Sequence, residues 1–434
     1  MEDYNNFLTE YAKADMVLHP VMRTRMGEYK IDGKNRDYSV AASGTYGTSR
    51  MNSYCIFENL LNQRDIVVRD RCEEDGKVWY EVNAKETQLA KEKARQMKEG
   101  FKNWIWQDID RREKYVEKYN NLFNAIRGRE YDGSHQTFPG MNPAIKLRPH
   151  QENAILRGKL GGNTLLAHCV GAGKSFEIVA TTMEKKRLGL ISKGCVVVPK
   201  HLTLQMASEW IRLYPNARLL VAHPEDFSKD NRQKFIARCV TGDYDAVIMS
   251  FTQFEKTPMS DEYRKQFLEK ELDEIMDALN EVDDTDRVSV KTLERQKRKI
   301  EERLEKLTSS KKDNSLCFEK LGFDYLAVDE FHNYKNCFIA TKMSNVAGVQ
   351  TTAAQKSEDM LMKTQYLNEK YGCNNLLAAT GTPLSNSMTE LYTMQRYLRP
   401  DLLENAGLEN FDDWASTFGE VVSQLEMKPA GDGY

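Results

Sequence analysis

Six short apolar runs, separated by stretches of helical periodicity, constrain the fold of this chain more than any other feature of its sequence. Each run holds about four residues, and the runs lie at 164–167, 195–198, 219–222, 246–249, 325–328 and 376–379. Strands that are buried on both faces read as continuous apolar runs, whereas strands with one solvent-exposed face alternate apolar and polar residues. The order of strands and helices therefore predicts an α/β fold, with a parallel sheet covered by helices on both faces.

The first ~135 residues follow a different pattern. Short strands are predicted at 65–69 and 78–82, and apolar residues at helical spacing predict one long helix from Thr87 to about Arg127. The apolar stripe of that helix is more typical of a core or docking face than of a base-stacking platform. A turn-rich stretch at 131–143 ends the region. We expect an accessory α+β region over residues 1–135.

One charged stretch interrupts the alternation of strands and helices. Residues 261–286 hold eleven acidic and three basic side chains, whereas residues 291–312 hold nine basic and four acidic ones, so the two arms attract each other. Each arm also carries leucines and isoleucines at coiled-coil-like spacing. The pattern predicts an antiparallel helical hairpin at about 260–312, joined near 283–289. A disordered charged loop is the alternative.

The composition excludes several classes of protein. With 434 residues, 40% hydrophobic and 29% charged, the chain is long enough for two or three domains. It lacks an apolar run approaching the ~18 residues that cross a bilayer, and its acidic start does not resemble a secretory signal, so we expect a cytoplasmic protein. Its eight scattered cysteines, without C-x-x-C pairs, indicate reduced thiols. A net charge of −3 means that any DNA contact must be local.

A glycine-containing loop between a predicted strand and a predicted helix is the first candidate site. It reads His168-Cys-Val-Gly-Ala-Gly-Lys-Ser175. Gly171 and Gly173 allow a tight turn whose N–H groups face an anion, while Lys174 supplies a charge for the β- and γ-phosphates and Ser175 a hydroxyl for Mg²⁺. The strict phosphate-loop pattern has glycine where this chain has His168. A chance glycine turn at a helix start is the alternative.

Two adjacent carboxylates follow the predicted strand at 325–328. A nucleotide-driven motor needs one acid to hold Mg²⁺ and another to orient the attacking water, and we assign Asp329 to the metal and Glu330 to the water. Acidic pairs at strand ends are often solvated caps, but this pair belongs to the same predicted sheet as Lys174. The two motifs together predict an ATP·Mg²⁺ site with Lys174, Asp329 and Glu330 as its catalytic residues.

Three segments then resemble motifs of the Swi/Snf-type superfamily 2 ATPases, in the order of that family. Leu147-Arg-Pro-His-Gln151 is similar to its L-R-P-x-Q segment, Asp329-Glu-Phe-His332 to its D-E-x-H box, and Ala379-Thr-Gly-Thr-Pro-Leu-Ser-Asn386 to its T-G-T-P-L-x-N motif. The resemblance covers about residues 145–425. It implies a first RecA-like ATPase lobe over 136–425, followed at 426–434 by the start of a linker to a second lobe.

A narrower resemblance points to the large helicase-methylase, antirestriction-like proteins of phages and conjugative elements. It rests on Tyr131-Asp-Gly-Ser-His135, Phe138-Pro-Gly-Met-Asn-Pro143, Leu165-Leu-Ala-His168 and Phe411-Asp-Asp-Trp-Ala-Ser-Thr-Phe-Gly419. The cell implied is bacterial or phage-infected.

The resemblance also implies roles for individual residues. Gln151 would read the adenine edge. The residues implied to hold the phosphates are Gly171, Ala172, Gly173, Lys174 and Ser175, with Ser175 and Asp329 as metal ligands. Those implied to couple the ATP state to DNA are His332, Thr380 and Thr382. Those implied to touch the backbone of duplex DNA are Lys200, His201 and Ser250. For these polar residues a strand-end or helix-cap role is the alternative.

A second lobe is the element that such a motor needs and that these motifs do not supply. Its arginines stabilise the transferred phosphoryl group, a contribution of about 10³–10⁵ in rate in related systems. We therefore expect a fragment that binds ATP and Mg²⁺ but hydrolyses ATP slowly. The second lobe, and an adenine-specific DNA methylase domain if one exists, would be encoded elsewhere in the parent protein. The rival hypothesis is a docking module with a vestigial nucleotide site.

Overall fold

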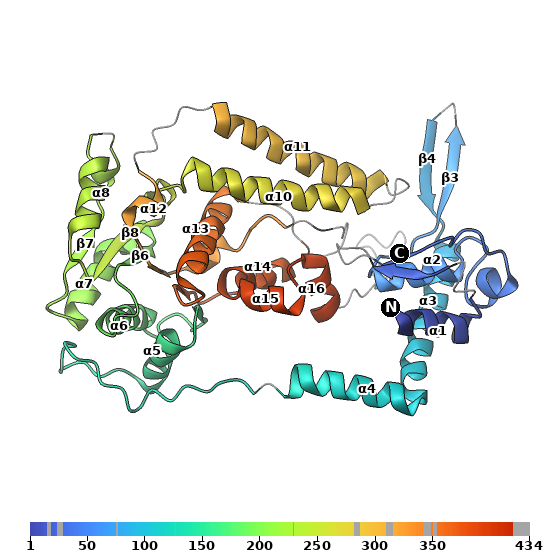
Figure 1. Ribbon diagram of the computed structural model, residues 1–434, viewed down its shortest axis with the longest axis horizontal. Coiled ribbons are helices and arrows are strands. Elements are labelled where there is room, and N and C mark those ends of the chain that lie inside the picture. Colours follow the sequence, from blue (N-terminus) through green and yellow to red (C-terminus); the bar gives the residue numbers. More distant parts are fainter. Residues whose placement is uncertain are drawn as a thin grey trace, which may run out of the picture. The chain divides into compact units, whose positions relative to one another are not determined.

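The computed structural model (Figure 1) describes the chain in two compact units, one of residues 1–129 with 412–434 and one of residues 130–411. The residues it describes are all except 15–18, 24–28, 75–76, 126, 229, 282–286, 310–315, 340, 342–348, 350–353 and 420–434. The predicted linker at 426–434 and most of the predicted joint at 283–289 lie outside the described residues. The predicted boundaries at 135 and 425 stay predictions.

The first unit is a mixed α+β body. Its elements are α1 (Glu2–Ala12), β1 (Val21–Arg23), β2 (Tyr29–Ile31), η1 (Ala41–Thr45), α2 (Ser53–Leu61), β3 (Arg69–Glu74), β4 (Lys77–Val82), α3 (Ala84–Gln107), α4 (Ile109–Tyr119) and η2 (Asn120–Asn124). Helices α1, α2 and α3 bury an aromatic core in which Phe7 contacts both Phe57 and Trp104. Strands β1–β2 and β3–β4 form two separate antiparallel ribbons.

The second unit is built on a six-stranded, wholly parallel sheet. Its strands are β5 (Thr164–Leu166), β6 (Gly194–Val198), β7 (Leu219–Val221), β8 (Ala246–Ser250), β9 (Tyr325–Val328) and β10 (Leu376–Ala379). Their spatial order is β5-β10-β9-β6-β8-β7. All six predicted runs are thus strands, to within one residue at either end. The α/β fold with a parallel sheet is confirmed.

Alternate residues of each central strand enter different hydrophobic cores. In β6, Val197 belongs to one core and Val196 and Val198 to the other, and β9 divides in the same way. Because side chains of a strand alternate between faces, the two cores lie on opposite faces of the sheet. Helices α5, α6 and α7 contribute to one core, and α8, α12, α13 and α14 to the other. Burial on both faces explains why the strands read as continuous apolar runs.

The connecting helices of the second unit complete the layers. They are α5 (Pro149–Leu160), α6 (Lys174–Arg187), η3 (Lys200–Leu202), α7 (Thr203–Leu213), η4 (Pro224–Phe227), α8 (Arg232–Thr241), α9 (Phe251–Glu255), α10 (Asp261–Glu281), α11 (Arg287–Ser309), α12 (Phe318–Leu321), η5 (Phe331–Tyr334), α13 (Gln355–Tyr371), α14 (Met388–Leu398) and α15 (Pro400–Ala406). The last helix, α16 (Phe411–Phe418), spans the division between the units. Among the described helices, none is both long and apolar enough to cross a membrane.

The charged stretch forms the predicted helical hairpin, with α10 and α11 packed side by side (Figure 1). The seam repeats every seven residues, with Leu268 and Ile275 buried on α10 and Leu293, Ile300 and Leu307 on α11. From α11, Arg303 forms a two-pronged ion pair with the buried Glu358 of α13, at 2.5 and 3.1 Å. The hairpin is thus anchored to the helix that leads into β10.

Two predictions for the first unit are wrong. Residues 65–68 are not a strand: Ile66 and Val68 are buried in the core of the unit, but pairing begins only at Arg69. The predicted long helix is broken at Asp108, whose backbone is extended and whose side chain caps α4 by accepting from the N–H of Arg111 at 2.7 Å. Helix α3 buries Trp104, whereas Ile109 and Tyr119 of α4 are exposed. The apolar spacing continues across the break, but the burial does not.

The hairpin seam yields a hydrogen-exchange prediction. Ile275→Asp places a carboxylate in a seam position that is 2% exposed, which costs several kcal/mol when no partner is present. We expect backbone amides of residues 266–280 and 290–306 to be protected in the parent chain and to lose protection by at least tenfold, roughly, in this variant. The neighbouring Met276→Asp, at a position 41% exposed, is the control and keeps the protection. Equal exchange in both variants would contradict a packed hairpin.

Candidate functional site

The order of the strands brings three sequence motifs to one edge of the sheet. Strand β10 lies between β5 and β9, and all three are parallel. The loop after β5, the acidic pair after β9 and the loop after β10 therefore emerge together at the carboxyl ends of the strands, where ligands bind in open α/β sheets. Two backbone bonds fix this edge: Thr380 N–H donates to Leu166 O at 3.1 Å, and Asp329 N–H to Val197 O at 2.9 Å.

The phosphate-loop candidate adopts a turn that only glycine makes without strain. Gly171 has φ 85° and Gly173 φ 89°, both in the left-handed region. Gly173 is the N-cap of α6, so Lys174 and Ser175 are its first two residues. The first N–H groups of a helix have no partner within the helix and face an anion site. The strand–loop–helix order predicted from the sequence is present.

The ammonium of Lys174 rests on the loop itself. It donates to the carbonyl oxygens of His168 and Cys169, at 3.0 and 3.1 Å. Phosphate oxygens would form stronger, charge-assisted hydrogen bonds than these neutral acceptors. Lys174 therefore lies against the loop, where an anionic ligand could replace the two carbonyl oxygens as its hydrogen-bond acceptor.

Gln151 and its neighbour brace the same loop from α5. The Gln151 amide accepts from Arg148 N–H at 2.9 Å and donates to Gly173 O at 3.2 Å, while His150 contacts Ala172 O at 3.0 Å. The amide that the family resemblance assigns to adenine is thus bound to protein backbone here. It lies beside the phosphate loop, but its role in reading adenine stays a prediction.

A buried carboxylate under the loop was not singled out from the sequence. Glu177, on the first turn of α6, is 0% exposed, and its carboxylate contacts Nδ1 of His168 at 2.9 Å. Burial raises the pKa of Glu177, and the nearby His168 opposes that shift. His168 stands where the strict pattern has glycine, so this pairing accounts for the departure: the histidine anchors the start of the loop to the helix that follows it. The only hint in the sequence was His168 itself, which stands where the strict phosphate-loop pattern has glycine.

The acidic pair meets the loop after β10. His332 Nδ1 lies 3.0 Å from the hydroxyl of the fully buried Thr380 and 3.2 Å from a carboxylate oxygen of Glu330. The same Thr380 hydroxyl accepts from Thr382 N–H at 3.1 Å. The Glu330 carboxylate, the His332 ring and the Thr380 hydroxyl thus lie in contact between the acidic pair and the loop, and the role of His332, Thr380 and Thr382 in coupling stays a prediction.

Asp329 lies deeper than Glu330 and within electrostatic reach of Lys174. It is 7% exposed, and burial is the main reason that its pKa is raised. The backbone N–H of Glu330 opposes the shift by donating to the carboxylate, the charge of Glu330 adds to it, and the charge of Lys174 opposes it. The amine and the acidic pair, 155 residues apart in the chain, therefore act on one another at the same edge of the sheet.

Glu330 has a strained backbone. Its φ of 50° and ψ of 47° place it in the left-handed region, where a residue with a side chain is uncommon. Its carbonyl accepts from the Asn333 amide at 2.9 Å, and η5 begins directly after it. The turn directs the chain away from β9 immediately after the acidic pair.

The loop after β10 is held by a buried ion pair. Glu390 of α14, 1% exposed, binds Lys335 at 2.9 Å and accepts from Ser385 N–H at 2.7 Å. Burial acts to raise the pKa of Glu390, but the hydrogen bonds from Lys335 and from backbone N–H groups outweigh it and leave the pKa lowered. Lys335 follows the D-E-x-H box by three residues, so this pair ties two of the motifs together.

The residues predicted to touch DNA are placed differently from one another. Lys200 and His201 are exposed on η3, directly after β6. Ser250 is 3% exposed, and its hydroxyl donates to the Gln253 side chain at 2.8 Å at the cap of α9. The helix-cap alternative thus describes the Ser250 hydroxyl, and the DNA contact of Lys200 and His201 stays a prediction.

Comparison with known families agrees with this arrangement. A family described as "Probable helicase domain" matches residues 156–431, which is more than half of the chain. The chain belongs to this helicase-domain family. A second family, described as "Domain of unknown function (DUF8437)", matches residues 1–125, ahead of the helicase domain.

Relatives of the helicase domain confirm the resemblance to Swi/Snf-type ATPases and to phage proteins. The chain is 23% identical over 377 residues to "Defense against restriction protein B" of Escherichia phage P1, which covers 77% of this chain and 17% of that protein. It is 32% identical over 99 residues to "ISWI chromatin-remodeling complex ATPase ISW1" of Saccharomyces cerevisiae, covering 23% of this chain and 7% of that one. The chain thus spans less than a fifth of the length of either relative.

A solved structure gives a more distant likeness to the helicase domain. It is the Sulfolobus solfataricus SWI2/SNF2 ATPase core in complex with dsDNA, with a TM-score of 0.35 and 17% sequence identity, covering 63% of this chain and 40% of that one.

The glycine at the start of α6 yields a stability and binding prediction. A Cβ at Gly173 would lie 2.3 Å from the Gln151 amide nitrogen, in addition to the strain of its positive φ. We expect Gly173→Ala to cost about 2–4 kcal/mol of unfolding free energy and to weaken ATP binding at least tenfold, roughly. Gly189→Ala is the control, because Gly189 has φ 70°, has open space around it and lies outside the site. It should cost about 1 kcal/mol and leave ATP binding unchanged. Equal losses in denaturant unfolding would contradict the clash.

The buried ion pair yields a pH prediction. A carboxyl group whose pKa is lower in the folded than in the unfolded chain stabilises the fold above the unfolded pKa, and this stability is lost as the pH falls through the folded pKa. Glu390→Gln should therefore cost about 2 kcal/mol at pH 7, with the gap to the parent closing as the pH falls below about 4. Denaturant unfolding at both pH values measures it, with the exposed Glu404→Gln as control. If the difference in unfolding free energy between the parent and Glu390→Gln does not change with pH, the charge of Glu390 does not stabilise the fold.

Proposed function

We propose that this chain is the ATP-binding first lobe of a DNA-dependent ATPase that moves along duplex DNA. The observation that carries the proposal is the convergence of Lys174 with the pair Asp329–Glu330 at the carboxyl edge of one parallel sheet. The membership of the helicase-domain family and the similarity to chromatin-remodeling ATPases support the same activity.

The residues at this edge divide the chemistry among them. The N–H groups at the start of α6 and the Lys174 ammonium hold the phosphates. Glu330 orients the attacking water, and its contact with His332 positions the carboxylate. The series of side-chain contacts from Glu330 through His332 to Thr380 and Thr382 transmits the state of the nucleotide to the loop after β10.

A magnesium ion fits the donor set at this site. Asp329 offers a buried carboxylate and Ser175 a hydroxyl, and hard oxygen ligands of this kind suit Mg²⁺, which usually binds through one or two protein groups together with substrate phosphates. When bound, the ion neutralises charge on the β- and γ-phosphates. The raised pKa of Asp329 reflects a buried carboxylate that lacks a full counter-charge, which a divalent cation would supply.

Contact with DNA is proposed for the exposed pair after β6. Lys200 and His201 would bind the phosphate backbone, so that binding depends on salt and little on sequence. A second RecA-like lobe of the parent protein would complete the ATPase with its arginines, and an adenine-specific methylase is a further proposed partner. The 434 residues by themselves should bind ATP·Mg²⁺ weakly and hydrolyse it slowly.

Two substitutions separate binding from hydrolysis. Lys174→Ala should weaken ATP·Mg²⁺ binding at least tenfold, roughly, because the phosphate charge loses its partner. Glu330→Gln should keep binding within about twofold and lower single-turnover hydrolysis about 10²-fold or more. Titration with a fluorescent ATP analogue and single-turnover assays measure both. Lys200→Ala is the control for the nucleotide and should weaken only DNA binding.

The outcomes also separate the proposal from its rival. If Lys174→Ala leaves ATP binding and the function of the parent protein intact, the docking-module hypothesis stands instead. Steady multiple-turnover hydrolysis by the 434 residues alone, stimulated by DNA, would contradict the need for a second lobe.

A further inference from the structure

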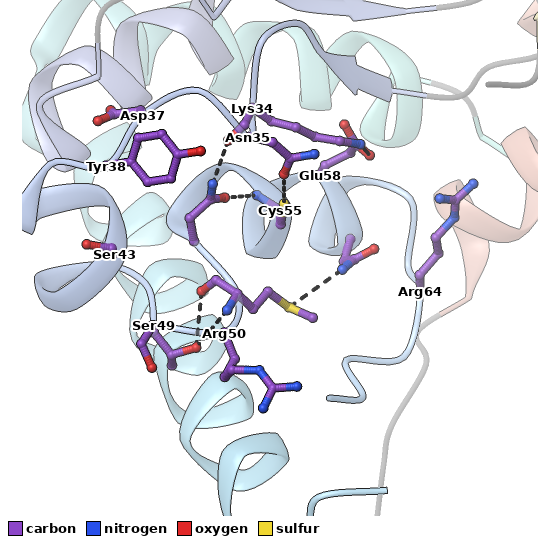
Figure 2. Close-up of a pocket in the computed structure, with 14 residues that line it drawn as sticks. Lys34, Asn35, Asp37, Tyr38, Ser43, Ser49, Arg50, Cys55, Glu58 and Arg64 are labelled. Atoms are coloured by element: carbon purple, nitrogen blue, oxygen red, sulfur yellow. Dashed lines mark hydrogen bonds and ion pairs between the residues drawn. The ribbon is translucent and has the colours of Figure 1, made fainter. Parts of the chain in front are cut away.

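The first unit contains a pocket of its own, about 430 Å³ in volume, between the 34–52 segment and helix α2 (Figure 2). That volume lies within the range of small-molecule sites. The pocket shares no residue with the phosphate loop or the acidic pair. It is therefore a candidate site that the ATPase chemistry does not use.

The acids of this pocket are already paired or hydrogen-bonded by groups of the same unit. Lys34, Arg50 and Arg64 line it together with Asp37 and Glu58. Glu58 binds Lys34 at 2.5 Å and accepts from a backbone N–H at 2.9 Å. Asp37 accepts from a tyrosine hydroxyl and a backbone N–H, each at 2.8 Å. Arg50 binds Asp70 outside the pocket, yet its side chain stays 45% exposed. The partly exposed Arg50 side chain is therefore a cationic group that the pocket offers to an anionic ligand.

Two asparagine amides in the wall have weak partners. Asn35 accepts from the Cys55 thiol at 3.6 Å, and Asn59 donates to the Met51 thioether at 3.9 Å. Sulfur is a poor hydrogen-bonding atom, so a ligand that offers nitrogen or oxygen would replace it with a gain. A primary amide presents a donor and an acceptor side by side, which matches the edge of a nucleobase.

An exposed aromatic ring stands at the edge of the pocket. Tyr38 is 87% exposed, and Figure 2 shows its hydroxyl directed toward the side on which Asn35 lies. Exposed aromatic rings near positively charged groups are a common platform on which unpaired bases stack. A ring exposed to this degree is available for such stacking without any change of the fold.

We propose that this pocket binds a single unpaired nucleotide. The base stacks on Tyr38 and is read by Asn35 and Asn59, and its phosphate lies against Arg50. The nucleotide can belong to an unpaired end of a DNA strand or be a free mononucleotide, since both present the same base and phosphate. In either case the first unit recognises a nucleotide independently of the ATP site.

The test uses the whole 434-residue chain and fluorescence anisotropy at one fixed salt concentration. The probes are a labelled blunt duplex, the same duplex with a short single-stranded overhang, and unlabelled dAMP as competitor. We expect the overhang to bind at least about fivefold more tightly than the blunt duplex. If dAMP displaces the overhanging DNA at a concentration close to that of the DNA, the pocket binds free mononucleotides. If dAMP does not displace it, the pocket binds the end of a strand.

Matched variants locate the effect. Tyr38→Ala should lower the affinity for the overhanging duplex by up to about tenfold and so remove the preference for it. Binding of the blunt duplex should not change. Tyr80→Ala is its control, because Tyr80 is a 65% exposed tyrosine of the same unit outside the pocket. Arg50→Ala and Arg71→Ala form a second pair, since both arginines are partly exposed and ion-paired but only Arg50 lines the pocket. Thermal unfolding by circular dichroism checks that each variant is folded.

The readout is separate from that of the ATPase. Lys174→Ala should keep the preference for the overhang, so loss of ATP binding and loss of this site are distinguishable. Equal affinity for blunt and overhanging DNA together with no binding of dAMP overturns the proposal. So does a preference for the overhang that survives both Tyr38→Ala and Arg50→Ala.

Discussion

The pairing of β10 with β5 on one side and β9 on the other is the interaction on which the candidate site depends. These three strands carry the phosphate-loop candidate, the loop of Thr380 and the acidic pair, and their order in the sheet differs from their order in the chain. The backbone bond from Thr380 to Leu166 closes the last position of that pairing. A shift of β10 by one residue would exchange the faces of Leu377 and Ala378 and remove Thr380 from His332. The cores on the two faces hold the register that the site requires.

Much of this arrangement was predictable because its signals are local. A strand buried on both faces must be apolar throughout, so the six runs of the parallel sheet stand out in the sequence. The positive φ of Gly171 and Gly173 had an equally local signal, since glycine is the residue that tolerates it. The hairpin could be predicted from its charge segregation and from the seven-residue spacing of residues such as Leu268 and Ile275.

What escaped prediction depends on contacts that spacing does not encode. Asp108 breaks the helix at 87–127 because its side chain caps a new helix, and the apolar spacing runs on regardless. Ile66 and Val68 look like strand residues in the sequence because they are apolar and β-branched, but in the part of the chain that the structure describes they are buried in the core and strand pairing begins only at Arg69. Ser250 was assigned to DNA from its motif; its hydroxyl forms part of the cap of α9, and a role at DNA stays a prediction. Each of these contacts depends on a partner that only the folded chain decides.

Glu330 places stability and chemistry in conflict at a single position. A left-handed backbone costs a residue with a Cβ about 1–2 kcal/mol, and glycine would adopt it freely. Relaxing the turn by that route would also delete the carboxylate that contacts His332. A stability screen of random variants should therefore enrich glycine at 330, while a screen for ATP hydrolysis should reject it. Glu330 therefore keeps a carboxylate at the edge of the sheet at the cost of a strained backbone.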